Sequence, residues 1–406
     1  MTGWQLTLLS GPSPDPSTWL EQSDLTAATG KKVLIYLDQP HEISFSMNGE
    51  HPEAQLVEEL TSDVVASFDD GTGAGQQKLV RARVGPSGDT GDETSVTCNF
   101  RALSYRDLLN RRILYTNKSY AAAYSGGLEA IGWDLITAAM SPDGGNLGIT
   151  RGTLGGTSAA GSGNPATDLE AGMVVAEQIT KMFEETPGYD WDITASLVWQ
   201  TYLRPRRVVP APGTVLPSTF GGRFLLDYGG SVASYTRTVD PADYANAVRV
   251  TGGTPETPPG GYVIPSQTAQ AAGLTESGTY PNGQLRQGRW DKQYSDTDIF
   301  TSQRALQRAQ ELVADSQVIT PTYTLTLKPG MWHGPADMWV GDECPVVIKH
   351  GRLNVDTVGL VTSLQVDIDD NGGDTVTVTV DGLDLKSAYY RKQRKLLADI
   401  ARLERH

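Results

Sequence analysis

The chain has 406 residues, of which 38% are hydrophobic and 20% charged, and its formal net charge is −15. This length predicts two to four domains, and the negative charge argues against a body built to grip nucleic acid. The first residues form no secretory signal and no apolar run approaches the ~20 residues that span a bilayer, so we expect a cytoplasmically made protein without membrane insertion.

Glycine and proline are abundant, at 44 and 23 residues, which indicates many turns and a β-rich fold. The two cysteines, Cys98 and Cys344, both lie in strand-like sequence. We expect them to be reduced, buried side chains that do not form a disulfide.

The first hundred residues read as β-structure. Ile43, Phe45 and Met47 alternate with polar residues, which is the pattern of a half-buried strand. Strands are predicted at 32–38, 42–47, 79–84 and 95–100, with a polar loop at 85–93.

A short helix is expected after these strands. Ser104 followed three residues later by Asp107 predicts a helix N-terminus, with Leu103 and Leu108 placed to pack across it. We expect this helix to run through Ile113.

Two longer helices follow. The first is predicted by the spacing of Leu128, Ile131, Leu135 and Ala139 and ends near 141–145. Residues 144–167 read as a loop rich in small residues. The second helix is expected over 168–185, with the apolar face Val175, Ile179, Met182 and Phe183, and a strand at 189–193 comes next.

The next stretch is mostly loop. Strands are expected at 224–228 and 247–251, and 252–290 is a surface excursion rich in Pro, Gly and Gln. A third helix is predicted over 301–316, with Leu306, Ala309, Leu312 and Val313 facing inward.

Residues 321–385 carry the clearest alternation in the chain. Thr and apolar residues alternate through 322–328, and again through 364–368 and 375–380 on either side of an Asn-Gly turn. Such alternation around Asn-Gly is the strongest local signal of a β-hairpin. We therefore expect a sheet with one face buried and one in water.

The last segment, 386–406, is predicted to be a basic helix with a narrow apolar seam. The seam residues fall at steps of four and three, as in a coiled coil; they are Tyr389, Gln393, Leu396, Ile400 and Leu403. Such a helix is marginal alone, so we expect self-association. A helix lying on its own domain and a frayed tail are the alternatives.

Sequence signatures of catalysis and metal binding are weak. The run Asp367-Ile368-Asp369-Asp370-Asn371-Gly372 matches the start of a calcium loop, but Val378 stands where a glutamate is required; we interpret it as a hairpin turn. The five histidines lack metal-ligand spacing, and no phosphate loop, nucleophile elbow or H-E-x-x-H helix occurs. We predict no catalytic residue, no cofactor and no metal.

Two surface features remain candidates for binding. Arg204, Arg206 and Arg207 form a compact basic cluster that either contacts an anionic partner or is a solvated loop. Trp332 and Trp339 either stack on a sugar or pack at the rim of a sheet.

Several motifs, in their order along the chain, resemble the tail-hub (baseplate hub-like minor tail) proteins of long-tailed phages that infect actinobacteria. The strand-to-helix junction at 100–112 is similar to that family, as is 131–136 followed by 145–150. Further similar segments are 189–193, 244–252, the helix at 305–306 leading to 323–325, and 340–342.

The resemblance implies an α+β, β-rich fold with two antiparallel β-barrel-like hub domains, an α/β insertion and a C-terminal coiled-coil helix. We expect the first barrel at 1–115, the insertion at 116–215, the second barrel at 216–385 with the surface loop 252–290 and the helix 301–316, and the coil at 386–406. The long loop has no clear counterpart in the family.

The implied function is structural, at the tail tip of the virion. Three copies are expected to form a ring around the DNA channel, next to the distal tail protein, the tape-measure protein and the tip or fibre proteins, with DNA passing through unbound. The coil suits a threefold contact, which Ile400→Asp together with Leu403→Asp is expected to loosen. The alternatives are a host-glycan-binding tail module, through Trp332, Trp339 or the loop 252–290, and a tail-associated peptidoglycan hydrolase.

Overall fold

The structure is a computed structural model and is mostly β. It describes residues 3–13, 15–71, 75–92, 95–122, 124–125, 127–142, 145–152, 167–185, 189–203, 206, 224–239, 244–255, 261–270, 289–297, 299–316, 321–370 and 373–381. The chain divides into two compact units: unit 1 comprises 1–236 and 323–406, and unit 2 comprises 237–322.

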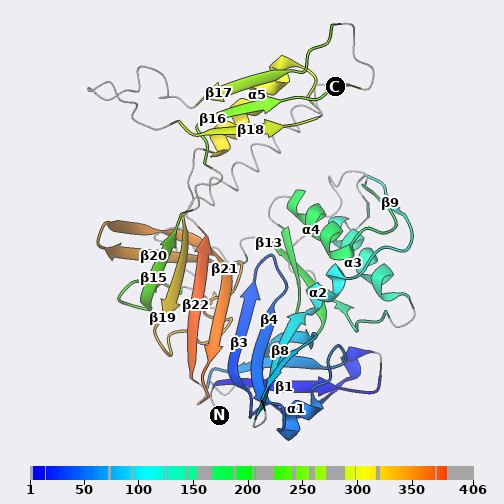
Figure 1. The fold of residues 1–406 in the computed structure, drawn as a ribbon, viewed down its shortest axis with the longest axis vertical. Coiled ribbons are helices and arrows are strands. Elements are labelled where there is room, and N and C mark those ends of the chain that lie inside the picture. Colours follow the sequence, from blue (N-terminus) through cyan, green and yellow to red (C-terminus); the bar gives the residue numbers. More distant parts are fainter. Residues whose placement is uncertain are drawn as a thin grey trace. The chain divides into compact units, whose positions relative to one another are not determined.

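Unit 1 is organised around one 14-stranded sheet (Figure 1). Its N-terminal strands are β1 (Gly3–Ser10), β2 (Leu20–Asp24), β3 (Thr29–Tyr36), β4 (Glu42–Asn48), β5 (Asp63–Asp69), β6 (Gln77–Val84), β7 (Gly88–Gly91) and β8 (Val96–Ser104), with the short helices η1 (Pro16–Thr18) and α1 (Pro52–Leu56) between them. Its C-terminal strands are β14 (Leu226–Asp227), β15 (Val232–Thr238), β19 (Thr322–Leu327), β20 (Glu343–His350), β21 (Leu353–Ile368) and β22 (Asp374–Asp381).

The predicted hairpin lies inside this sheet, between β19 and β3. β21 and β22 pair antiparallel with Leu364 opposite Val378 and Val366 opposite Val376, and Gly373 N donates to the Asp369 side chain in the turn. The hairpin is confirmed. On its other side β21 pairs with β3, which places Leu364 opposite Ile35.

Pairing of β3 with β21 joins the strands of both expected barrels into one sheet, drawn in blue and orange in Figure 1. A single hydrophobic core runs under it, from Leu6 in β1 to Val380 in β22. Trp4 Nε1 also donates to Asp374 Oδ2 at 3.0 Å. The first and last described strands are therefore held in one body.

A helical insertion lies between β8 and β14. It contains α2 (Tyr105–Asn110), β9 (Lys118–Tyr120), α3 (Gly127–Met140), β10 (Thr150–Arg151), β11 (Thr167–Leu169), α4 (Val175–Glu185), β12 (Tyr189–Ile193) and β13 (Val198–Leu203). These elements surround a second core, to which the predicted apolar faces of α3 and α4 contribute Ile131, Leu135, Ile179 and Phe183.

Some predicted boundaries in this region are wrong. The helix expected from 168 begins at Val175, because Thr167–Leu169 pairs with β9 instead. The helix after Ser104 ends at Asn110, and the Ser104 hydroxyl does not cap it, since it accepts a hydrogen bond from His41 N. The loop predicted at 85–93 holds the short strand β7.

Unit 2 is a three-stranded sheet with one helix. Its elements are β16 (Ala247–Thr251), β17 (Ser266–Gln270), β18 (Asp291–Ser295) and α5 (Ser302–Ser316), and the strand order is β17-β16-β18. β17 lies inside the segment predicted to be a loop, and β18 was not predicted. The helix is confirmed, but Leu306 is exposed and Ala305 takes the inward position beside Ala309.

Candidate functional site

One cluster of buried polar groups in unit 1 lies where the large sheet meets the insertion. His41, in the turn between β3 and β4, is buried, and its Nε2 lies 3.2 Å from Asp192 Oδ2 on β12. Its Nδ1 accepts a hydrogen bond from the backbone N–H of Tyr36 at 3.2 Å. Because Nδ1 is an acceptor, the proton of a neutral ring sits on Nε2 and is donated to Asp192.

The third residue of this junction is Arg106, which lies on α2. Its Nη1 donates to the carbonyl oxygens of Leu37, at 3.2 Å, and Trp191, at 3.4 Å, and its guanidinium lies 4.4 Å from the centre of the Trp191 ring. Burial raises the pKa of Asp192, but His41 and Arg106 outweigh it and hold that pKa below its ordinary value. The junction therefore fixes the insertion to the sheet.

Ser104, His41 and Asp192 have the composition of a hydrolytic triad but not its geometry. The Ser104 hydroxyl is buried and accepts a hydrogen bond from the backbone N–H of His41 at 2.9 Å. Both ring nitrogens of His41 are occupied by other groups, so no base faces the hydroxyl. A nucleophile needs such a base, and this trio is structural.

A second buried charge cluster lies inside the large sheet. Asp63 is fully buried and receives hydrogen bonds from Arg81 Nε at 2.7 Å, Arg83 Nε at 2.5 Å and the Tyr105 hydroxyl at 2.6 Å. Burial, followed by the Asp63 charge, raises the pKa of Tyr105. The Arg83 guanidinium also lies 4.5 Å from the Trp19 ring. The hydrogen-bond and ring partners of this cluster all belong to the same chain, so the cluster stabilises the fold.

Of the predicted basic contact residues and seam residues, the structure describes only Arg206. Arg206 donates its backbone N–H to Gly341 O at 2.7 Å, and its guanidinium lies 4.5 Å from the Tyr202 ring. Arg204 and Arg207 lie outside the described residues, as do the seam residues Tyr389, Gln393, Leu396, Ile400 and Leu403.

The tryptophans considered for sugar stacking are buried. Trp332 donates its indole N–H to Met338 O at 3.1 Å and stacks on Trp4 with ring centres 5.9 Å apart. Trp339 also belongs to the core under the large sheet. Both side chains are therefore packed in the core of unit 1.

In the described part of the chain, no three His, Cys, Asp or Glu side chains are grouped so as to hold a metal ion. None of the helices in the described ranges is long and apolar enough to cross a bilayer. Of the calcium-like run, Asp367 and Ile368 are the last residues of β21, and Asp369 accepts a hydrogen bond from Gly373 N.

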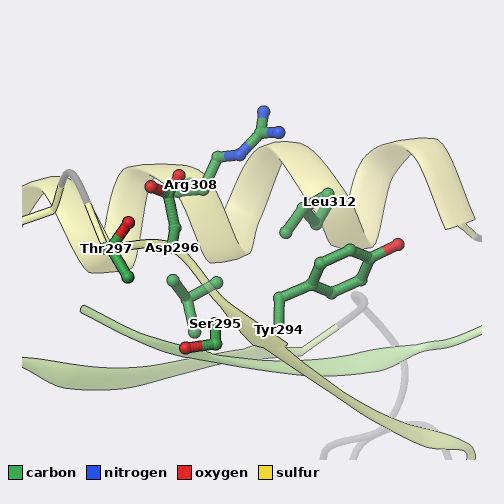
Figure 2. A pocket seen from close by; sticks show the side chains of 7 residues that line it. Tyr294, Ser295, Asp296, Thr297, Arg308 and Leu312 are labelled. Carbon is green, nitrogen blue, oxygen red and sulfur yellow. The ribbon is translucent and has the colours of Figure 1, made fainter. Parts of the chain in front are cut away.

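Unit 2 contains a cavity of about 270 Å³ between α5 and β18 (Figure 2). Tyr294 and Leu312 lie on facing sides of it (Figure 2). The other lining residues are Val250 and the polar residues Ser295, Asp296, Thr297 and Arg308. This volume falls just below that of pockets for drug-sized ligands and has room for one aliphatic side chain.

Sequence reasoning missed the His41–Asp192 junction and this cavity. The two junction residues are 151 positions apart, and a single sequence carries no local signal that joins them. A partial signal was present in the predicted strand 189–193, where Asp190 and Asp192 alternate with Tyr189, Trp191 and Ile193.

Solved structures of phage tail proteins share this fold. The 43 kDa tail protein of prophage MuSo2 from Shewanella oneidensis superposes with a TM-score of 0.55 and 12% identity, over 93% of this chain and 98% of that one. The tail protein from Neisseria meningitidis MC58 gives 0.54 and 9%, over 93% and 96%. Prophage tail protein gp18 from Listeria monocytogenes EGD-e gives 0.50 and 9%, over 97% and 99%.

Sequence comparisons add nothing to this likeness, since no protein-family model and no curated protein matches the chain. At 9–12% identity the similarity establishes a shared fold. The fold expected from the resemblance is thus confirmed at the level of a mostly β phage-tail-protein fold.

Proposed function

We propose that this chain is a structural hub protein at the tail tip of a phage virion. Three copies form a ring that connects the tail tube to the tip and fibre proteins and surrounds the DNA channel. The observation that carries this proposal is the likeness to three phage tail proteins over at least 93% of this chain and 96% of theirs.

The large sheet supplies the mechanical property that a hub requires. Strands from both ends of the chain are hydrogen bonded in one sheet over one core, and close-packed interiors transmit strain rather than absorb it. Load applied to one half of unit 1 therefore reaches the other half directly. No catalytic step is part of this role.

The charge of the chain fits a channel wall. A formal net charge of −15 disfavours phosphate contacts, which dominate affinity for DNA, so DNA passes without binding. The neighbours proposed for the ring are the distal tail protein, the tape-measure protein and the tip or fibre proteins. Arg204, Arg206 and Arg207 are the proposed contact with a partner, and the C-terminal seam is the proposed threefold coil.

Light scattering of the purified chain tests the stoichiometry. Three chains of 43.7 kDa predict a particle of about 131 kDa. Immunogold labelling of intact virions, with an antibody against this chain, tests the position and is expected to mark the tail tip alone. Label along the tail tube or on the capsid would contradict the proposal, as would clearing of peptidoglycan by the purified chain in a zymogram.

A further inference from the structure

The edge of unit 2 formed by β17 is unusual within the described structure. Natural sheets protect their edges with charges, prolines or bulges, because an unpaired edge recruits other strands. β17 reads Ser-Gln-Thr-Ala-Gln and pairs with β16 without a bulge. Among the edge strands in the described ranges, it alone carries neither a charged residue nor a proline.

The ladder shows which backbone groups of β17 face outward. Gly252 N donates to Pro265 O at 2.7 Å, and hydrogen-bonding positions alternate along an antiparallel pair. Gln267 and Ala269 therefore face β16, while the amides of Ser266, Thr268 and Gln270 point to the open edge.

The strand at the opposite edge, β18, also has backbone groups that point outward at every second residue. Asp296 N donates to Thr251 O at 2.9 Å, and Trp290 O accepts from Ala247 N at 3.1 Å. The alternation then directs the backbone groups of Asp291, Gln293 and Ser295 outward. Both edges are five residues long and lie at the same level, with Ser266 and Ser295 both beside Thr251.

Helix α5 leaves the inner face of β18 uncovered. The buried core of unit 2 takes Val248 and Val250 from β16 and Ala269 from β17, but β18 contributes only the half-buried Tyr294. The cavity in Figure 2 lies on this uncovered strip, between Tyr294 and Leu312.

An exposed apolar turn precedes β17. Val263 is 80% and Ile264 49% exposed. The turn is held firmly, because the Tyr262 hydroxyl donates to Gly253 O at 2.7 Å and Gly252 N binds Pro265 O. A Cβ on Gly253 would lie 2.1 Å from Thr297 O, so the close approach of these segments requires glycine.

We propose that the β17 edge of one copy pairs antiparallel with the β18 edge of the next, and that the Val263–Ile264 turn fills the neighbour's cavity. In this pairing Ser266 of one copy meets Ser295 of the other, which brings the turn beside Thr297 at the mouth of the cavity. Outward-facing amides then meet outward-facing carbonyls along the whole edge.

The occupant is a second copy of this chain, and this inference rests on the threefold ring proposed above. A contact that repeats around a threefold axis must join two different surfaces, whereas an edge paired with itself gives a twofold dimer. The spacing also fits: three strands at about 4.8 Å span about 14 Å, which accommodates one helix per copy at packing distances of 8–10 Å.

A disulfide across the edge tests the register. Thr268 and Gln293 are exposed and would lie opposite each other in neighbouring copies, where paired Cα atoms about 5.5 Å apart permit a disulfide. Within one chain they are two strand spacings apart, about 9.6 Å, which is too far for a disulfide. The full chain carrying Thr268→Cys and Gln293→Cys is oxidised and run on a non-reducing gel, with each single variant as control.

The expected result is a covalent trimer from the double variant and no trimer from either single variant. A chain that is trimeric by light scattering but yields no covalent trimer would overturn the edge pairing and leave the proposed hub intact. A covalent dimer from Thr268→Cys alone would mean that the edge pairs with itself, which also overturns it. A monomeric chain would overturn both proposals.

Point variants give a second readout. Ile264→Asp places a charge in the proposed cavity contact, and Thr268→Pro removes an outward amide while leaving the amides that face β16. Both are expected to lower the mass from about 131 kDa towards 43.7 kDa, with an unchanged circular dichroism spectrum. The matched control Leu20→Asp, an exposed aliphatic on the charged edge strand β2, should leave the mass unchanged. Equal masses for all three would contradict the contact.

Discussion

The large sheet of unit 1 and the small sheet of unit 2 treat their edges in opposite ways. The large sheet ends in β2, which carries Glu21 and Asp24, and in β15, which carries Arg237. The small sheet ends on one side in β18, which carries Asp291 and Lys292, and on the other in the uncharged strand β17. Unit 1 therefore has edges protected against further pairing, whereas unit 2 presents an edge that favours it.

The two sheets also differ in how they are stabilised. Unit 1 buries whole ladders of Val, Leu and Ile together with a charged cluster around Asp63, while unit 2 has a core of a few residues under one helix. The contrast indicates that unit 1 supplies rigidity and unit 2 supplies an interaction surface. Four predictions test it, beginning with the largest expected effect.

Removing the buried carboxylate of unit 1 should cost the most. Asp63→Ala leaves Arg81 and Arg83 buried without their partner, and breaking such a cluster typically lowers the free energy of unfolding by about 3–5 kcal/mol. Urea unfolding of the full chain measures it. The control is Asp356→Ala, which breaks the exposed pair with Lys349 and should change little; equal effects would refute the role assigned to the cluster.

Truncating a core leucine should cost more in unit 1 than in unit 2. Leu364 is fully buried between β3 and β22, so Leu364→Ala should lower the free energy of unfolding by about 2–5 kcal/mol. Leu312 already borders a cavity, and Leu312→Ala should fall at the low end of that range. Hydrogen exchange of β22 and β18 reports each unit separately. If Leu312→Ala lowered the free energy of unfolding more than Leu364→Ala, the proposed difference between the two units would be contradicted.

Acid should weaken unit 1 through Asp192. Its folded pKa lies below the ordinary 3.8, so its contribution is complete above that pH and is lost as the pH falls through the folded pKa. Asp192→Asn should therefore destabilise the chain at neutral pH, and the difference in unfolding free energy from wild type should shrink as the pH falls below 3.8. Urea titrations at neutral pH and below pH 3.8 measure this. A difference independent of pH would show that the charge of Asp192 is irrelevant.

The smallest effect is expected at the protected edge. Glu21 on β2 pairs with Lys78, and both are largely exposed, so Glu21→Gln should change the free energy of unfolding by no more than about 0.5 kcal/mol. Removing the charge should nevertheless increase concentration-dependent association, measured by light scattering. Unchanged association would show that the edge is protected by something other than charge.

The parts of the fold that could be predicted from the sequence are those with apolar periodicity. Alternation around the Asn-Gly turn located the β21–β22 hairpin, and the spacing of Ile131 and Leu135 located α3. β17 and β18 were missed because their inward residues are few, Ala269 and Tyr294, and the rest is polar. The other two elements of unit 2, β16 and α5, were predicted, whereas β17 lies in a segment that composition alone marks as loop.

Other differences arise from tertiary contacts that local sequence cannot encode. Asp168 and Leu169 were predicted to begin a helix, but Thr167–Leu169 pairs with β9 as a strand. Leu306 was predicted to face inward, but it is exposed, and its neighbour Ala305 is buried instead. The candidate sites also depend on tertiary contacts. His41 meets Asp192, and the cavity forms between α5 and β18, only after distant segments pack together.

The most direct test of the proposed hub is the density of this chain in a cryo-electron microscopy map of the intact virion. The account predicts three copies at the tail tip, related by a threefold axis, with the large sheets around the channel and β17 of each copy beside β18 of the next. Density for this chain away from the channel, or in copies unrelated by a threefold axis, would contradict it.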